Sequence, residues 1–246
     1  MLPLLLALAA APAGPADTAE RRTRDCLALA RSAPAQAASR ARTWLGEGGG
    51  VAAAQCLGLA LTAQEKWTDA AAAFEAAAKD AEARQDKRQG ELLAEAGNAW
   101  LAAGENAKAR TALEAALATG LLAPKLAGEA HLDLGRAAVA AGDGAGARIH
   151  IDKGLDLVPD DAFAWYLSAA LARKQDDLPR AQKDIAKAAG LAPDDPAILL
   201  EAGNIAGASG ERDAALGLYA RAARLGPNTE AGKAAQAALA ANPDPR

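Results

Sequence analysis

Hydrophobic and polar positions recur along this chain at a fixed spacing. The period is 34 residues in two series: Pro159, Pro193 and Pro227, and Ala147, Ala181 and Ala215. Between these positions, long alanine-rich segments carry apolar residues at helical spacing, and none of them has the β-branched run typical of a strand. A period of this size is typical of an array of identical helical units. The pattern therefore predicts an all-α chain.

The same frame continues toward the N-terminus with a longer period. It carries glycines and large apolar residues at Gly58, Gly97, Gly135 and Gly203, and at Phe74, Leu113, Ile151, Ile185 and Tyr219. The upstream spacings are 38 and 39 residues, and the additional residues fall in segments 79–90 and 119–126. We expect them to lengthen a second helix by about one turn, which preserves the packing register.

The recurring positions resemble the tetratricopeptide repeat family. In that family, the first helix of each unit carries a Leu-Gly pair and an aromatic residue, and the second carries a small residue, an aromatic and an alanine before a proline. Matching residues are Leu57-Gly58, Leu134-Gly135 and Trp165, then Trp67, Ala70, Phe74 and Ala77, and Ala215, Tyr219, Ala222 and Pro227. Ser168-Ala169 replaces the Leu-Gly pair in the fourth unit. The resemblance implies a right-handed α-solenoid of antiparallel helix pairs, with five repeats at residues 51–89, 90–127, 128–161, 162–195 and 196–229.

Both ends of the array are predicted to differ from the repeats. Residues 17–50 are expected to form a divergent helical hairpin anchored by Trp44, and residues 230–246 a capping helix and tail. Residues 2–11 are apolar apart from Pro3 and are followed by small residues, as in a signal peptide at residues 1–16, although no basic residue precedes them. The apolar run is too short to span a bilayer. We therefore expect a periplasmic or secreted protein with no integral membrane segment after cleavage.

Composition narrows the classes of partner. The chain is 51% hydrophobic but only 3% aromatic, which indicates a core of alanine and leucine. Its formal net charge of -4 creates no field that would attract nucleic acid. Cys26 and Cys56 fall on first helices of adjacent hairpins, and in an exported chain an even cysteine count favours a disulfide. Two buried free thiols are the alternative.

The sequence shows no catalytic or metal-binding pattern. Each of the two histidines, His131 and His150, is followed two residues later by an aspartate, Asp133 or Asp152. Residues two apart point away from each other on a helix, so neither pair can chelate one ion. We therefore expect a chain that is not an enzyme, with no cofactor and no metal.

The frame also predicts which first-helix residues face the concave side. These lie one or two positions from the packing residues: Gln55, Asn98, Arg136, Tyr166, Arg173 and Asn204. Asn98 and Asn204 follow glycines, which resembles the Gly-Asn of chaperone-binding family members that clamp a peptide carboxylate. The basic partners of that clamp are not matched, because Ala94, Leu132 and Leu200 stand at those places. Arg136 and Arg173 could pair with an acidic partner segment; the alternative is that both are solvated or bonded within the solenoid.

Two functions from different classes fit this pattern. The first is a non-enzymatic scaffold that binds a peptide or protein partner on its concave face, since solenoids create extended grooves there. The second is an accessory subunit of a cell-envelope enzyme or assembly complex, in which the chain supplies only assembly contacts. The partner itself is not identified by the sequence.

Overall fold

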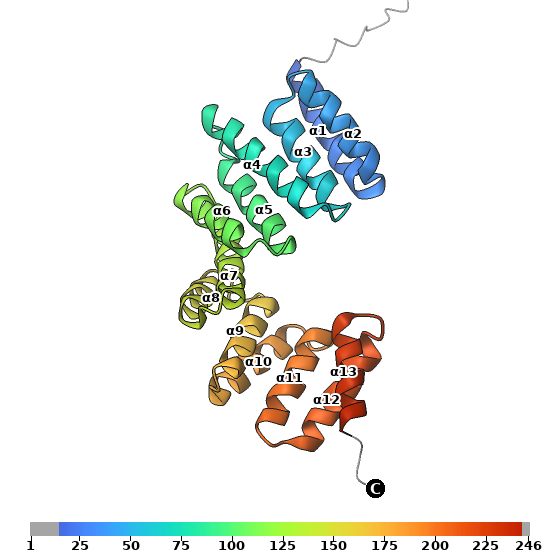
Figure 1. The fold of residues 1–246 in the computed structure, drawn as a ribbon, viewed down its shortest axis with the longest axis vertical. Helices are drawn as coiled ribbons and strands as arrows, with labels where there is room; N and C mark the ends of the chain where they lie inside the picture. The colour runs from blue at the N-terminus through green and yellow to red at the C-terminus, as the bar shows by residue number, and fades with distance from the viewer. Residues whose placement is uncertain (1–14, 243–246) are drawn as a thin grey trace, which may run out of the picture. The chain divides into compact units, whose positions relative to one another are not determined.

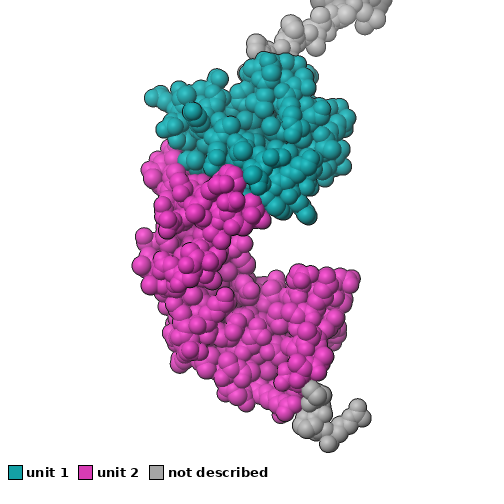
Figure 2. Space-filling model, in the orientation of Figure 1, with its two compact units in different colours: residues 1–99 teal, residues 100–246 magenta. Residues whose placement is uncertain are grey.

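The structure is a computed structural model that describes residues 15–242 of the chain, and every regular element in that range is an α-helix. Most of the residues predicted as a signal peptide, 1–14, lie outside the described range. The prediction of an all-α helical solenoid is confirmed. The chain divides into two compact units, residues 1–99 and 100–246, which are coloured separately in Figure 2.

Unit 1 is a layered stack of antiparallel helices (Figure 1). Its helices are α1 (Pro15–Ser32), α2 (Pro34–Gly46), α3 (Gly50–Thr62), α4 (Trp67–Ala83) and the first part of α5 (Gln89–Ala102). Helix α3 packs against α1, α2 and α4. Trp44 is only 7% exposed, and the guanidinium of Arg22 lies 5.0 Å from the centre of its ring.

Unit 2 is itself an up-and-down arrangement of helices. Its helices are α6 (Asn106–Ala118), α7 (Pro124–Ala140), α8 (Gly144–Leu157), α9 (Ala162–Lys174), α10 (Leu178–Leu191), α11 (Pro196–Ala208), α12 (Arg212–Leu225) and α13 (Glu230–Ala241). Each helix from α6 to α13 packs against the next, and α7, α9, α11 and α13 also contact one another in succession. These four helices therefore form a continuous face of unit 2.

Glycines on first helices let the helices of one hairpin approach closely. A Cβ atom added to Gly58 would lie 2.5 Å from the ring of Phe74, and one added to Gly203 would lie 2.5 Å from the ring of Tyr219. Both large side chains are buried. The aromatic residue of the second helix thus fills the space over the glycine of its own hairpin, where a larger residue would separate the backbones.

Helix starts follow the aspartates after the repeated prolines. Asp161 and Asp195 are N-caps, whose carboxylates accept hydrogen bonds from the backbone N–H of Phe163 at 2.9 Å and of Ala197 at 2.8 Å. The tight turns inside the hairpins require a left-handed residue, and Gly142 and Gly210 supply it with φ of 77° and 81°.

One expectation about helix length is wrong in part. Helix α4, with 17 residues, is lengthened as predicted, but α6 has only 13 residues. The extra residues before α7 instead form a turn and lengthen α7, a first helix, to 17 residues. Gly120, with φ of 65°, ends α6, and Pro124 starts the next helix at its first position, so the chain cannot extend the second helix here.

Candidate functional site

Helix α9 presents a stripe of side chains on the face formed by the first helices. Phe163, Tyr166 and Arg173 follow one another at spacings of three and seven residues, which places them on one side of the helix. The rings of Phe163 and Tyr166 stack with centroids 5.8 Å apart. Phe163 is 46% exposed, so this stacked pair offers apolar aromatic surface to solvent.

The same stripe ends in a polar cluster that joins α9 to α11. The guanidinium of Arg173 donates to both carboxylate oxygens of Glu201, at 2.6 and 3.2 Å. The Asn204 amide donates to Glu201 at 3.1 Å and its oxygen accepts from the Tyr219 hydroxyl at 3.0 Å. Glu201 is buried, so these bonds replace the hydration that its carboxylate loses. We call Phe163, Tyr166, Arg173, Glu201 and Asn204 the first-helix face.

The charges of this cluster shift the acid–base behaviour of its members. The hydrogen bond to Glu201 raises the pKa of the Arg173 guanidinium above its ordinary value. Burial, followed by the negative charge of Glu201, raises the pKa of the Tyr166 hydroxyl. Arg173 is therefore charged and Tyr166 neutral throughout the physiological range.

The structure brings only some of the predicted groove residues together. Arg173 and Asn204 share Glu201, and Tyr166 lies on the same stripe of α9. Arg136 instead donates to Asp133 of its own helix at 2.7 Å. Arg136 and Arg173 are thus both bonded within the solenoid. This arrangement agrees with the second of the two alternatives for these arginines, and not with an arginine left unpaired for an acidic partner segment. In unit 1, Gln55 accepts from Arg88 at 3.4 Å and Asn98 is exposed.

A partly buried polar network that the sequence did not predict joins α8, α9 and α10. Ser168 is fully buried and its hydroxyl donates to Asp184 at 2.5 Å. Arg148 donates to the hydroxyl and the carbonyl oxygen of Ser168, at 2.8 and 3.1 Å. Arg180 donates to Asp184 at 3.2 Å and also binds Asp152. We call these five residues the polar network.

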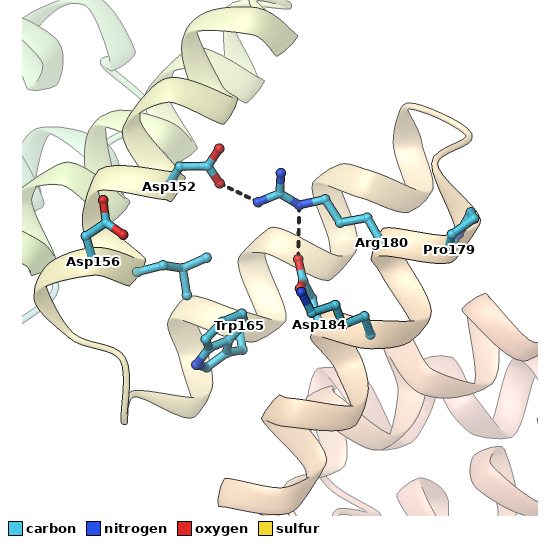
Figure 3. Close-up of a pocket in the computed structure, with 8 residues that line it drawn as sticks. Asp152, Asp156, Trp165, Pro179, Arg180 and Asp184 are labelled. Carbon is cyan, nitrogen blue, oxygen red and sulfur yellow. Dashed lines mark hydrogen bonds and ion pairs between the residues drawn. The ribbon is translucent and has the colours of Figure 1, made fainter.

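Three members of the polar network, Asp152, Arg180 and Asp184, line a pocket of about 570 Å³ between α8, α9 and α10. In Figure 3, Arg180 reaches from α10 toward Asp152 of α8, and Trp165 of α9 lies beside them. The complete lining is Asp152, Leu155, Asp156, Trp165, Pro179, Arg180, Lys183 and Asp184. None of the predicted groove residues belongs to it. Its walls come mainly from second helices, so it is separate from the first-helix face.

His131 and His150 face each other across the hairpin of α7 and α8. Their Nδ1 atoms are 3.2 Å apart and their ring centroids 5.4 Å apart. The centroid distance exceeds the nitrogen distance by about the two ring radii, so the nitrogens point at each other, as in a hydrogen bond in which the N–H of one imidazole donates to the other ring. To chelate one metal ion, the lone pairs of the two nitrogens would have to converge on a point off the line that joins them. Burial, and then positive neighbours including Lys153, lowers the pKa of both histidines.

In unit 1, the structure pairs Cys26 of α1 with Cys56 of α3 in a disulfide. Their Cα atoms are 6.1 Å apart, within the range that a disulfide spans, and both residues are buried. No free cysteine remains. The oxidation state in solution stays a prediction, which thiol counting would test.

Two kinds of feature are absent from residues 15–242. That range holds no group of three or more histidine, cysteine, aspartate or glutamate side chains arranged to bind a metal ion. It also holds no helix with the length and apolar character that crossing a membrane requires.

The clusters around Glu201 and Asp184 could not be predicted from the sequence, for a physical reason. Glu201 and Asp184 are charged residues at buried positions, and their partners lie 28 and 16 residues away, on other helices. Helical spacing predicts contacts within one helix, and these cross between helices. The only local signal was Ser168, a polar residue at a position where the frame expects leucine.

No protein-family model matches the chain, and no curated protein matches it. Similar folds are found among solved structures. PilF of Pseudomonas aeruginosa is 18% identical with a TM-score of 0.70, and the match covers 90% of this chain and 99% of that one. YrrB, described as a TPR protein with an unusual peptide-binding site, is 18% identical with a TM-score of 0.54, covering 75% of this chain and 91% of YrrB.

A third match is MamA from Desulfovibrio magneticus. It is 17% identical with a TM-score of 0.58, and the match covers 73% of this chain and 97% of MamA. At such identities the likeness concerns the fold. Together with the 34-residue period and the antiparallel hairpins, it shows that the chain has the fold of the tetratricopeptide repeat proteins.

Proposed function

We propose that this chain is a non-enzymatic scaffold that binds a peptide or protein partner on its first-helix face. The observation that carries the proposal is the stacked pair of Phe163 and Tyr166, which exposes aromatic surface on the face shared by α7, α9 and α11. Aromatic residues held rigidly at a surface are the residues that most often dominate binding energy. The peptide-binding site named for YrrB, a protein of similar fold, is consistent with this class of function.

The polar cluster beside the aromatic pair supports the same function. Arg173 is fixed by Glu201, and Asn204 is fixed by Glu201 and Tyr219. Because these side chains are already held in place, a partner would not have to order them on binding. The polar cluster would therefore orient a bound partner, and the adjacent aromatic surface would supply most of the binding energy. An acidic partner segment is not required, because the charge of Arg173 is already neutralised.

We also propose that the mature protein acts outside the cytoplasm. The apolar segment at residues 2–11 and the Cys26–Cys56 pair agree with export, since disulfides persist in oxidising compartments. Fractionation with N-terminal sequencing should find mature protein that begins near Gly14 or Asp17 outside the cytoplasm. An intact N-terminus on cytoplasmic protein would contradict this part of the proposal.

Site-specific photocrosslinking in intact cells tests the binding face. A photoreactive phenylalanine at position 163 should give adducts, and mass spectrometry would identify the partner. The matched control is the same probe at Leu225 of α12, which is 42% exposed but lies on a second helix.

A second variant measures the contribution of the aromatic pair. With the probe kept at position 163, Tyr166→Ala should reduce the adduct yield at least tenfold, the effect of losing about 1.4 kcal/mol of binding energy. Equal adducts from positions 225 and 163, or an unchanged yield in Tyr166→Ala, would show that the partner binds elsewhere.

A further inference from the structure

The pocket between α8, α9 and α10 contains charges that the fold itself does not use. Asp152, Arg180 and Asp184 are bound to one another or to the rest of the polar network. Asp156 and Lys183 also line the pocket, and both are exposed. Neither forms an ion pair or a side-chain hydrogen bond with any described residue.

These two uncommitted charges lie on opposite walls. Asp156 belongs to α8, with Asp152 one turn before it, and Lys183 belongs to α10, with Arg180 three residues before it. In Figure 3, Asp152 and Asp156 lie on the α8 side of the pocket, and Arg180 and Asp184 on the α10 side. The charge of Asp184 is paired with Arg180, so Lys183 is the charge of the α10 side that has no bonded partner among the described residues. Asp156 and Lys183 do not reach each other, so each can accept an external charge of opposite sign.

An apolar surface joins the two walls. Leu155 and Trp165 line the pocket, and the indole N–H of Trp165 donates to the carbonyl oxygen of Pro159 at 2.7 Å. This bond fixes the indole and satisfies its only polar atom, which leaves the ring free for apolar or cation–π contact. The adjoining polar network holds α8, α9 and α10 in register, so the pocket is formed before any ligand arrives.

We propose that this pocket binds a short peptide segment in which a basic and an acidic side chain are separated by apolar residues. The basic side chain pairs with Asp156 beside the indole of Trp165, and the acidic side chain pairs with Lys183. The intervening apolar residues pack on Leu155 and Trp165. The pocket volume of about 570 Å³ lies within the range usual for ligand sites.

Ligands of simpler charge fit the pocket less well. A purely cationic segment would face Lys183 without a counter-charge, and a purely anionic one would face Asp152 and Asp156. A peptide with its charges three residues apart spans about 10 Å when extended.

Titration of the full mature chain with blocked tetrapeptides, followed by NMR, tests this proposal. The probe is acetyl-Lys-Leu-Leu-Glu-amide, and the comparison peptides replace lysine, glutamate or both with glutamine. The dipolar peptide should bind several-fold more tightly than either singly charged peptide and should shift the indole resonance of Trp165, which Trp165→Phe identifies. Equal binding of all four peptides, or no binding at millimolar concentration, overturns the proposal.

Charge variants provide the sharper control. Asp156→Lys and Lys183→Asp should each weaken binding of the dipolar peptide about two- to fivefold or more, the range expected for an exposed ion pair. The double swap restores one charge of each sign, so the peptide can bind in the reverse direction and affinity should recover. Asp213→Asn and Arg224→Gln on α12 are matched controls outside the pocket and should change nothing. Failure of the double swap to recover affinity contradicts charge recognition.

This proposal stands apart from the first-helix face. Tyr166→Ala should leave binding of the dipolar peptide unchanged, and Asp156→Lys should leave adducts from position 163 unchanged. If Tyr166→Ala removed both activities, the pocket would be part of the first-helix site, and the proposal of a separate site would be wrong.

Discussion

At the scale of single residues, Ser168 is the buried side chain that joins Arg148 to Asp184 in the polar network. Its hydroxyl donates to Asp184 and accepts from Arg148, and no described buried side-chain polar atom lacks a partner. Ser168→Ala removes the donor and the acceptor together and leaves both charged partners short of a bond. We expect a loss of about 1–3 kcal/mol in the free energy of unfolding, measured by urea denaturation.

Ser209→Ala is the matched control for this prediction. The Ser209 hydroxyl only accepts from Gln182 at 3.0 Å in an exposed contact, so its loss should change the unfolding free energy by less than about 0.5 kcal/mol. Equal effects of the two substitutions would mean that the polar network contributes no stability.

His131 and His150 predict a dependence of stability on pH. The pKa of each is lower in the folded protein than the ordinary value of 6.5, because of burial and then nearby positive charge, with Glu114 and Asp143 partly offsetting it at His150. The unfolded chain therefore binds protons at a higher pH than the folded chain. Stability is complete above the unfolded pKa and is lost as pH falls through 6.5 toward the folded pKa.

The measurement is the urea midpoint between about pH 8 and pH 5, above the range in which ordinary carboxylates titrate. The midpoint should fall as pH decreases, and His131→Gln, which removes one of the two titrating groups, should flatten the dependence. If His131→Gln kept the original pH profile, the histidine pair would be excluded as the source of the pH dependence.

At the scale of the helix, two glycines of unit 2 should respond to alanine in opposite directions. A Cβ atom at Gly232 of α13 would lie far inside contact distance of the Gly226 backbone oxygen, whereas one at Gly217 of α12 would meet nothing within 4 Å. Gly232→Ala must displace α13 from the end of unit 2 and should cost about 1–3 kcal/mol. Gly217→Ala should stabilise by about 0.5–1 kcal/mol through helix propensity.

Thermal unfolding monitored by circular dichroism distinguishes the two glycine variants. The midpoint should fall for Gly232→Ala and rise for Gly217→Ala. A rise of similar size in both would show that helix propensity, and not the fit of α13 against the preceding turn, governs this end of the molecule.

At the scale of the whole molecule, the Cys26–Cys56 pair closes a loop across the first two hairpins. The two cysteines are 30 residues apart, and a disulfide over such a loop contributes about 2–4 kcal/mol. Reductant should lower the unfolding midpoint of the protein, and the Cys26→Ser/Cys56→Ser double variant should be insensitive to it. Two free thiols per denatured, unreduced chain would contradict the disulfide.

The sequence predicts the fold better than the sites because the two depend on different kinds of contact. The 34-residue period and the Gly58–Phe74 type of packing depend on positions inside one hairpin, and these appear directly in the sequence. The N-caps at Asp161 and Asp195 are local as well. Glu201 and Asp184, in contrast, meet their partners on α9 only when α11 and α10 pack against that helix. Helical spacing alone does not give the distances between residues on different helices.

In a repeat array each hairpin contacts only its neighbours, so hairpins that make the same contacts can replace one another. The polar network makes the junction of α8, α9 and α10 an exception within unit 2. Excision of the α9–α10 hairpin would place Arg148 opposite Ala202 instead of Ser168, and would leave a partly buried charge without two of its hydrogen bonds. In descendants of this chain, we therefore expect these two hairpins to be inherited together, and recombination to be tolerated better between hairpins joined only by apolar contacts.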